Sequence, residues 1–259
     1  MIYILNIPCE ASEAVELIKE VFEDRLVGIY LYGSFVLGGL KPESDLDLLV
    51  ITNSDLTTED RKDLTHGLMG ISGEIGNKLG KRFLEVTVFN ENSLNPFSYP
   101  PKYEYIYGEW DREDYKSGKL PETTYDPDGT ILLAQARENS VTLFGEDIKE
   151  IIPQIGMEYI IKALKADIPI LLEGVREEGK NTVLTLARIW YTVFTEKITS
   201  KDNAANWAMA ILPKEQGALL NLAKEEYLGN LKVNWNDKEE ELVLLVEYMK
   251  KEIEKLLED

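Results

Sequence analysis

Two aspartates one residue apart, Asp45 and Asp47, open an apolar run that continues as Leu48-Leu49-Val50. Residues i and i+2 of a β-strand point to the same face, so this spacing predicts two neighbouring carboxylates. Aspartate is a poor strand residue, and two like charges on one face repel each other unless a cation lies between them. Carboxylate oxygens suit Mg²⁺, which substrate phosphates usually complete. Taken alone, an Asp-x-Asp pair is explained equally well as a turn entering a strand.

A glycine-serine pair precedes the two aspartates. The run 27–32 reads as a strand that ends at Gly33 and Ser34. Gly33 has no side chain, which allows close approach of the backbone to a ligand, and Ser34 adds a hydroxyl and an N–H group. A strand, a Gly-Ser turn, a short loop and an Asp-x-Asp strand resemble the signature of the DNA polymerase β-like nucleotidyltransferases. In that superfamily Gly-Ser holds nucleotide phosphate and the aspartates hold the catalytic metals.

A third acid, Glu85, lies in the alternating segment 82–89, which predicts another strand. A carboxylate inside an apolar strand is costly to bury unless it is paired or binds metal. One interpretation places Glu85 on an edge strand facing solvent. The other places it beside the aspartates, where it would complete the metal site or remove a proton from an attacking hydroxyl.

Trp110 lies between two acids, Glu109 and Asp111, after an aromatic-rich stretch. Aromatic clusters usually belong to the core. An indole with carboxylates beside it is also suited to a cationic sugar, because the ring face and the acids both attract positive charge. We therefore treat Trp110 as a candidate substrate contact.

The composition indicates a globular, strongly acidic protein. The 259 residues include 28 Lys and Arg against 47 Asp and Glu, for a formal net charge of −19. This balance disfavours nucleic acid and anionic membranes as partners and favours cationic small molecules. Cys9 is the single cysteine and His66 the single histidine, which excludes an intrachain disulfide and a multi-histidine zinc site. With no signal peptide or transmembrane run recognised, we expect a cytoplasmic monomer.

Helical periodicity separates the chain into two parts. Helices are expected over 12–22, from Thr57 to about Ile75, and from Asp126 or Asp128 to near Asn139. Beyond Pro153 every pattern is helical. The predicted fold is α+β, with a nucleotidyltransferase domain at 1–153, built on a mixed sheet flanked by helices, and an all-α bundle at 154–259.

Two basic residues of the helical part are candidates for binding phosphate. Arg188 lies beside an apolar stripe formed by Val183, Leu186, Ala187, Trp190 and Phe194. Ser200 is a plausible N-cap, which would place Lys201 in a first helical turn, where the macrodipole disfavours a cation. Bound phosphate would make Lys201 favourable there. The alternative is a solvated lysine with a small energetic cost.

Over nearly its whole length the chain resembles the aminoglycoside nucleotidyltransferases that adenylylate spectinomycin and streptomycin. The matching segments are Leu31-Tyr32-Gly33-Ser34, Gly38-Gly39-Leu40-Lys41-Pro42, Ser44-Asp45-Leu46-Asp47-Leu48-Leu49-Val50, Leu84-Glu85-Val86-Thr87-Val88, Tyr107-Gly108-Glu109-Trp110, Leu184-Thr185-Leu186-Ala187-Arg188-Ile189-Trp190-Tyr191, Thr199-Ser200-Lys201-Asp202 and Tyr227-Leu228-Gly229. The resemblance implies in-line attack of a drug hydroxyl on the α-phosphorus of MgATP, with release of pyrophosphate. It also implies that ATP and drug bind between the two domains.

The resemblance assigns a role to each candidate by position. Asp45 and Asp47, with Glu85, would hold Mg²⁺, as two ions, and Glu85 would act as the base. The remaining implied contacts to ATP are Gly33 and Ser34 at phosphate, Arg188 and Lys201 at the triphosphate, and Tyr227 beside the adenine.

Drug choice depends on three further positions. Family members that accept both drugs hold streptomycin with a tryptophan, an aspartate and a histidine, and Trp110, Glu178 and Asn181 align with them. Spectinomycin-only relatives carry asparagine at the last position, so the resemblance favours the spectinomycin 9-hydroxyl, with the streptomycin 3''-hydroxyl as an alternative. Other acceptors, including another small molecule or a protein, and a non-catalytic nucleotide sensor, stay open as rival functions.

Overall fold

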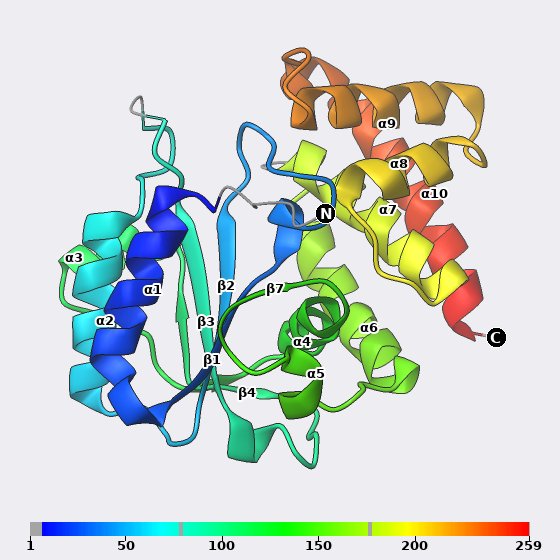
Figure 1. Ribbon diagram of the computed structural model, residues 1–259. Coiled ribbons are helices and arrows are strands. Elements are labelled where there is room, and N and C mark those ends of the chain that lie inside the picture. The colour runs from blue at the N-terminus through cyan, green and yellow to red at the C-terminus, as the bar shows by residue number, and fades with distance from the viewer. Residues whose placement is uncertain (1–6, 78–79, 176–177, 259) are drawn as a thin grey trace, which may run out of the picture. The chain divides into compact units, whose positions relative to one another are not determined.

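The computed structural model describes residues 7–77, 80–175 and 178–258, which form two compact units (Figure 1). The first unit comprises the chain up to Gly39 together with Ser44–Ile155. The second comprises Leu40–Glu43 together with Gly156 onward. The loop between the Gly-Ser pair and the two aspartates therefore contributes four residues to the second unit.

The first unit is a mixed sheet with helices on both faces. Its five-stranded sheet has the order β5-β3-β2-β1-β7, in which β2 and β3 run parallel and the other neighbours are antiparallel. In Figure 1, α1 and α2 lie on one face of this sheet and α4 and α5 on the other. The strands are β1 (Leu26–Leu31), β2 (Leu46–Thr52), β3 (Leu84–Asn90), β5 (Tyr105–Tyr107) and β7 (Val141–Gly145), and a separate pair is formed by β4 (Lys102–Tyr103) and β6 (Thr124–Tyr125).

Side-chain caps and hydrogen bonds to neighbouring strands set the ends of helices in the first unit. The α-helices are α1 (Cys9–Phe22), α2 (Thr58–Ile71), α3 (Arg112–Lys116), α4 (Asp128–Glu138) and α5 (Ile148–Ile151). Thr57 and Asp60 form a reciprocal capping box at the start of α2. The expected end near Ile75 was wrong, because Ser72 takes an extended conformation and its hydroxyl accepts from the backbone of Leu84.

Apolar strands form the core of this unit. Leu46, Leu48, Leu49, Val50 and Ile51 of β2 are fully or almost fully buried. A strand buried on both faces reads as a continuous apolar run, as expected when helices cover both sides of a sheet. Polar side chains at the ends of such strands are consequently held on a rigid base.

The second unit is entirely helical within its described residues. Its α-helices are α6 (Met157–Glu173), α7 (Gly179–Thr195), α8 (Lys201–Met209), α9 (Lys214–Tyr227) and α10 (Glu239–Glu258), with a 3₁₀ turn at Trp235–Lys238 before α10. Helix α7 is central, because α6, α8, α9 and α10 all contact it. Most of its expected apolar stripe is buried, but Phe194, at the end of that stripe, is 61% exposed.

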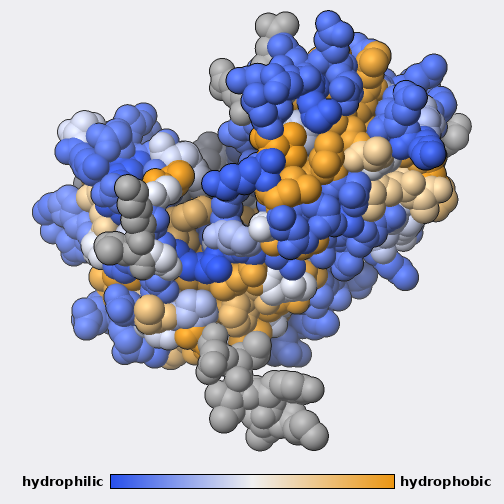
Figure 2. Space-filling model, turned by 90° about the horizontal axis from the view of Figure 1, so that it is seen from above, coloured by the Kyte–Doolittle hydropathy of each residue, from blue (hydrophilic) through white to orange (hydrophobic). Residues whose placement is uncertain are grey.

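The surface is mainly polar. Hydrophilic residues cover most of the face drawn in Figure 2, with hydrophobic residues reaching it in patches. Such a surface agrees with the excess of acidic over basic residues in the sequence. In the described part of the chain, every helix is too short or too polar to cross a bilayer.

Candidate active site

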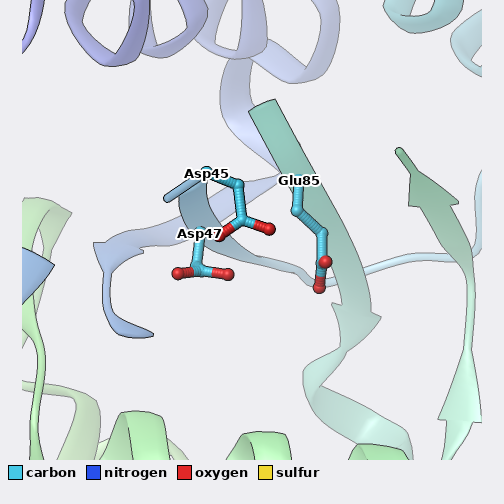
Figure 3. Close-up of side chains that lie close together, drawn as sticks. All are labelled: Asp45, Asp47 and Glu85. Atoms are coloured by element: carbon cyan, nitrogen blue, oxygen red, sulfur yellow. The ribbon is translucent and has the colours of Figure 1, made fainter. Parts of the chain in front are cut away.

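Three carboxylates converge at one end of the central strands. Asp45, Asp47 and Glu85 each offer a carboxylate oxygen, and these oxygens all lie within 4.8 Å of one another. Figure 3 shows the three side chains pointing into a common space, two from the segment entering β2 and one from β3. Asp45 precedes β2 by one residue, so its expected place within the strand was wrong. The two aspartates nevertheless lie side by side.

The pairing of β2 with β3 brings Glu85 to the aspartates. In the parallel ladder Asp47 lies opposite Glu85, and Leu46 and Leu48 are paired with Leu84 and Val86. Side chains at matched positions of neighbouring strands share a face, so the two carboxylates are neighbours. Strand β3 lies between β2 and β5 inside the sheet, and the interpretation of Glu85 as a solvent-facing edge residue was wrong.

The Gly-Ser turn fits closely against this acidic cluster. Gly33 begins a 3₁₀ turn with φ of +67°, and a Cβ atom at this position would overlap the carboxylate of Asp47. Only glycine combines this backbone conformation with such a close approach. The backbone N–H of Tyr32 donates to the carbonyl of Asp47 at 3.0 Å, which joins the turn to β2.

Ser34 supplies a buried hydroxyl next to the acids. Its Oγ atom has no hydrogen-bond partner among the described residues. A buried polar atom without a partner is energetically costly, and a ligand that accepts or donates there would remove the cost. The Ser34 hydroxyl is therefore available to a phosphate oxygen, on the same turn that contacts Asp47.

Burial and mutual repulsion shift the acid-base chemistry of the cluster. The pKa of Glu85 is raised well above its ordinary value, first by loss of hydration and then by the charges of Asp47, Asp45 and Asp128. The same burial, with Glu85 and Asp47 nearby, raises the pKa of the Tyr32 phenol well above its usual range. A carboxylate with a raised pKa is a stronger proton acceptor once it is ionised.

Asp128 is a fourth acid that sequence reasoning did not assign to the site. It begins α4, and its charge acts on Glu85 across the fold. Only its place at a helix start was readable from the sequence. Its nearness to Glu85 follows from the packing of α4 against the sheet.

The donor set fits a divalent metal and a nucleotide. Hard carboxylate oxygens are the ligands that Mg²⁺ prefers, and a cation between these three carboxylates would relieve their repulsion. Gly33 and Ser34 add space and a hydroxyl at the same place. The residues present therefore match the expected Mg²⁺ and phosphate site.

Trp110 lies on the surface of the first unit, with 56% of its area exposed. It belongs to the 3₁₀ turn Glu109–Asp111, and its ring lies against Gly108, where an added Cβ atom would overlap the indole. The backbone of Gly108 is extended, with φ of −148°, so the space for the ring, and not backbone freedom, calls for glycine.

Glu109 serves a structural purpose and was wrongly expected to help hold a cation beside Trp110. Its carboxylate is buried, with Oε2 at 2.5 Å from Nε of Arg112 and Oε1 at 2.5 Å from the hydroxyl of Tyr107. Burial raises the pKa of Glu109, but the hydrogen bonds from Arg112, Ser72 and Tyr107 outweigh this and lower it overall. Arg112 neutralises the charge, and the network anchors the turn that presents Trp110.

The candidate phosphate residues of the second unit lie on helices around its core. Ser200 caps α8 as expected, accepting from the N–H of Asn203 at 3.4 Å, and Lys201 opens that helix. Nζ of Lys201 lies 5.9 Å from the ring centroid of Tyr227, at the end of α9. Arg188 projects from α7 and is half-buried. The structure thus groups Lys201 with Tyr227, as a shared nucleotide site would require.

Glu178 and Asn181, the candidate drug-selecting pair, both line one pocket of about 670 Å³ in the second unit. Glu178 directly precedes α7 and Asn181 lies in its first turn. Glu226 and Trp235 line the same pocket and were not singled out by sequence reasoning. Their positions in separate elements left no local signal that they would meet Glu178.

Comparisons with known proteins cover almost the entire chain. Spectinomycin 9-adenylyltransferase of Staphylococcus aureus is 46% identical over 249 residues, which are 96% of either chain. The aminoglycoside (3'') (9) adenylyltransferase of Escherichia coli is 36% identical over 98% of this chain and 97% of its own. The crystal structure of an Enterococcus spectinomycin adenyltransferase with ATP and spectinomycin matches with a TM-score of 0.89, 32% identity, and coverage of 95% of this chain and 98% of that one.

The fold and the acidic site define a nucleotidyltransferase of the polymerase β-like class. The family model for the polymerase beta nucleotidyltransferase domain matches residues 16–94. A second model, for the C-terminal domain of aminoglycoside adenylyltransferases, matches residues 150–252. The chain belongs to the aminoglycoside adenylyltransferase family, and it is an enzyme.

Proposed function

We propose that this enzyme transfers AMP from MgATP to the 9-hydroxyl of spectinomycin and releases pyrophosphate. The observation that carries the proposal is the pairing of Asp47 with Glu85 beside the Gly33 turn. This pairing brings three carboxylates close to the turn, and we take them as the metal ligands and the proton acceptor beside a phosphate-binding turn. The named activity of the 46% identical relative from Staphylococcus aureus supports the acceptor.

Asp45, Asp47 and Glu85 would hold Mg²⁺, for which we propose two ions. When bound, the metal would neutralise phosphate charge and polarise the α-phosphate. Gly33 leaves room for the phosphates. The hydroxyl of Ser34 would donate a hydrogen bond to one phosphate oxygen, and the buried Oγ atom would then have a partner. The acid cluster and the turn then act as one binding surface.

Glu85 accepts the proton of the drug hydroxyl. The oxygen so activated forms a bond to the α-phosphorus, and the bond between that phosphorus and the oxygen bridging to the β-phosphorus breaks, with pyrophosphate leaving. The position of Glu85 opposite Asp47 supports this role, because a general base must lie within reach of the proton it removes. Positioning and charge stabilisation supply most of the remaining acceleration in phosphoryl and nucleotidyl transfer.

The second unit would supply positive charge and part of drug selection. Arg188 and Lys201 neutralise the triphosphate, and Tyr227 lies beside the adenine, in keeping with its place next to Lys201. Trp110 would provide an apolar plate for the drug. Glu178 and Asn181 would select between drugs, and asparagine in place of a titratable histidine favours spectinomycin over streptomycin.

The function is tested by pyrophosphate release from the purified protein with MgATP and with spectinomycin, streptomycin or no drug. We expect release with spectinomycin and background levels without drug. Release with both drugs would show that Glu178 substitutes for aspartate in streptomycin recognition. No release with either drug would overturn the proposed acceptor, and the other acceptor classes would then be tested.

A further inference from the structure

The pocket that contains Glu178 and Asn181 is also lined by other side chains that could recognise a ligand. It is bounded by the start of α7, the end of α9, the Trp235 turn and the start of α10. Its volume of about 670 Å³ lies in the range of ligand sites for small molecules. Glu226, Trp235 and Glu239 join Glu178 and Asn181 in its lining, with Leu242 as an apolar wall.

The charge of this pocket selects for a cation. Three glutamates are among the residues that line it, namely Glu178, Glu226 and Glu239. Lys180 also lines it, but its ammonium is paired with Glu43 at 2.7 Å. Neither Glu178 nor Glu226 forms an ion pair with a lysine or arginine among residues 7–77, 80–175 and 178–258. The pocket consequently carries negative charge that a cationic ligand would neutralise.

The carboxylate of Glu226 is held by a hydrogen bond, although a negative charge is unfavourable at its position on the helix. It lies in the last turn of α9, where the helix dipole presents partial negative charge and a carboxylate is unfavourable. Glu178 and Glu239, in contrast, lie at helix starts, where carboxylates are favoured. Trp235 fixes Glu226 by donating its indole N–H to Oε2 at 2.6 Å. A bound cation would turn the unfavourable position of Glu226 into an interaction that contributes to affinity.

We propose that Glu226 is a specificity-determining residue that contacts a protonated amine or guanidinium group of the drug, with Trp235 holding its carboxylate toward the ligand. This inference rests on the proposed function, because the ligand is taken to be the cationic acceptor of AMP transfer. It adds Glu226 and Trp235 to the drug site and makes the pocket selective for charge as well as for shape.

The experiment compares Glu226→Gln with the matched control Glu225→Gln. Both remove one negative charge at neighbouring positions, but Glu225 is outside the pocket and contacts Asn230 and Lys224. Glutamine at 226 can still accept the hydrogen bond of Trp235, so the local fold is preserved. We expect Glu226→Gln to raise the KM for spectinomycin about tenfold, as loss of a charge-assisted hydrogen bond predicts, with the KM for ATP unchanged. Glu225→Gln should match the wild type.

The outcomes separate this proposal from the proposed function. An unchanged drug KM in Glu226→Gln, with an active wild type, would overturn only the role of Glu226. A raised KM for ATP in its place would overturn the assignment of the pocket to the drug. Calorimetric titration of spectinomycin and streptomycin into both proteins gives a readout that does not require turnover. A wild type that binds neither drug and releases no pyrophosphate would overturn both proposals.

Discussion

Asp47 lies directly opposite Glu85 in the parallel pair of β2 and β3, so that two carboxylates from distant parts of the sequence share one face of the sheet. Two ionised carboxylates in this arrangement are unfavourable, because the charges repel and burial weakens their hydration. The raised pKa of Glu85 reflects both effects, with burial the larger. The close approach of Asp47 to Glu85 therefore lowers the stability of the fold without a cation, and it forms a site at which a cation would bind favourably.

Replacing Asp47 by asparagine should abolish turnover and leave the fold intact. Loss of a metal-binding charge at the reaction centre is expected to lower kcat by at least about 100-fold, while relief of repulsion with Glu85 keeps the melting temperature equal or higher. Pyrophosphate release and thermal unfolding measure the two effects. Wild-type release by Asp47→Asn would remove the metal role assigned to this residue.

Alanine at position 33 should inactivate the enzyme far more strongly than alanine at position 39. Both glycines have positive φ, so each substitution carries a similar backbone cost of about 1–2 kcal/mol. At Gly33 the new methyl group would also collide with Asp47, whereas at Gly39 no atom lies within 4 Å of it. We expect Gly33→Ala to lose at least about 100-fold in kcat, the scale of a lost electrostatic stabiliser.

The matched variant Gly39→Ala isolates the steric effect from backbone strain. Gly39→Ala should retain turnover within a few-fold of wild type. Its melting temperature should fall only slightly, by the amount that the backbone cost alone predicts. Equal turnover in Gly33→Ala and Gly39→Ala would mean that the close approach to Asp47 has no functional importance.

Alanine at Gly108 should act through the ring of Trp110. The extended backbone of Gly108 accepts any residue, so the added methyl group affects the protein by displacing the indole. We expect Gly108→Ala and Trp110→Ala each to raise the KM for the drug about tenfold, a magnitude typical of an aromatic contact, with the KM for ATP unchanged.

A double-mutant cycle checks this coupling. The double variant Gly108→Ala with Trp110→Ala should be no worse than Trp110→Ala alone, because the displaced group is already gone. Additive losses in the double variant would show that Gly108 acts independently of Trp110.

The ion pair between Arg25 and Asp60 should make stability depend on acidity. Two hydrogen bonds at 2.7 and 2.8 Å from Arg25, with further ones from Thr57, lower the pKa of Asp60 to about 2. Because the folded pKa lies below the unfolded one, the stabilisation is complete above about pH 5 and is lost as the pH falls toward 2. After allowance for solvent screening it amounts to about 1–2 kcal/mol at neutral pH.

Asp60→Asn should therefore lower the free energy of unfolding at pH 7 and flatten its dependence on pH between about 5 and 2. Chemical denaturation at several pH values measures both. Asp63→Asn, at an exposed position of the same helix, is the matched control and should behave as wild type. A loss in Asp60→Asn that stays constant across this pH range would contradict the linkage.

Local patterns in the sequence were sufficient for the elements and the class of fold. Alternation identified the strand containing Glu85, and the capping box at Thr57 and Asp60 marked the start of α2. These features depend on hydrogen bonds and side-chain periodicity within a few residues, so they are legible without tertiary contacts. The Asp-x-Asp and Gly-Ser motifs were legible for the same reason, and the family they indicated was confirmed.

What the sequence determined by itself was which residues could do chemistry: Asp45, Asp47, Glu85 and the Gly33 turn. The tertiary structure alone decided their companions. The register of β2 against β3 set Glu85 opposite Asp47, and the packing of α7, α9 and α10 set Glu226 in the pocket of Glu178. Register and packing depend on contacts between segments far apart in the chain, and no local pattern encodes them.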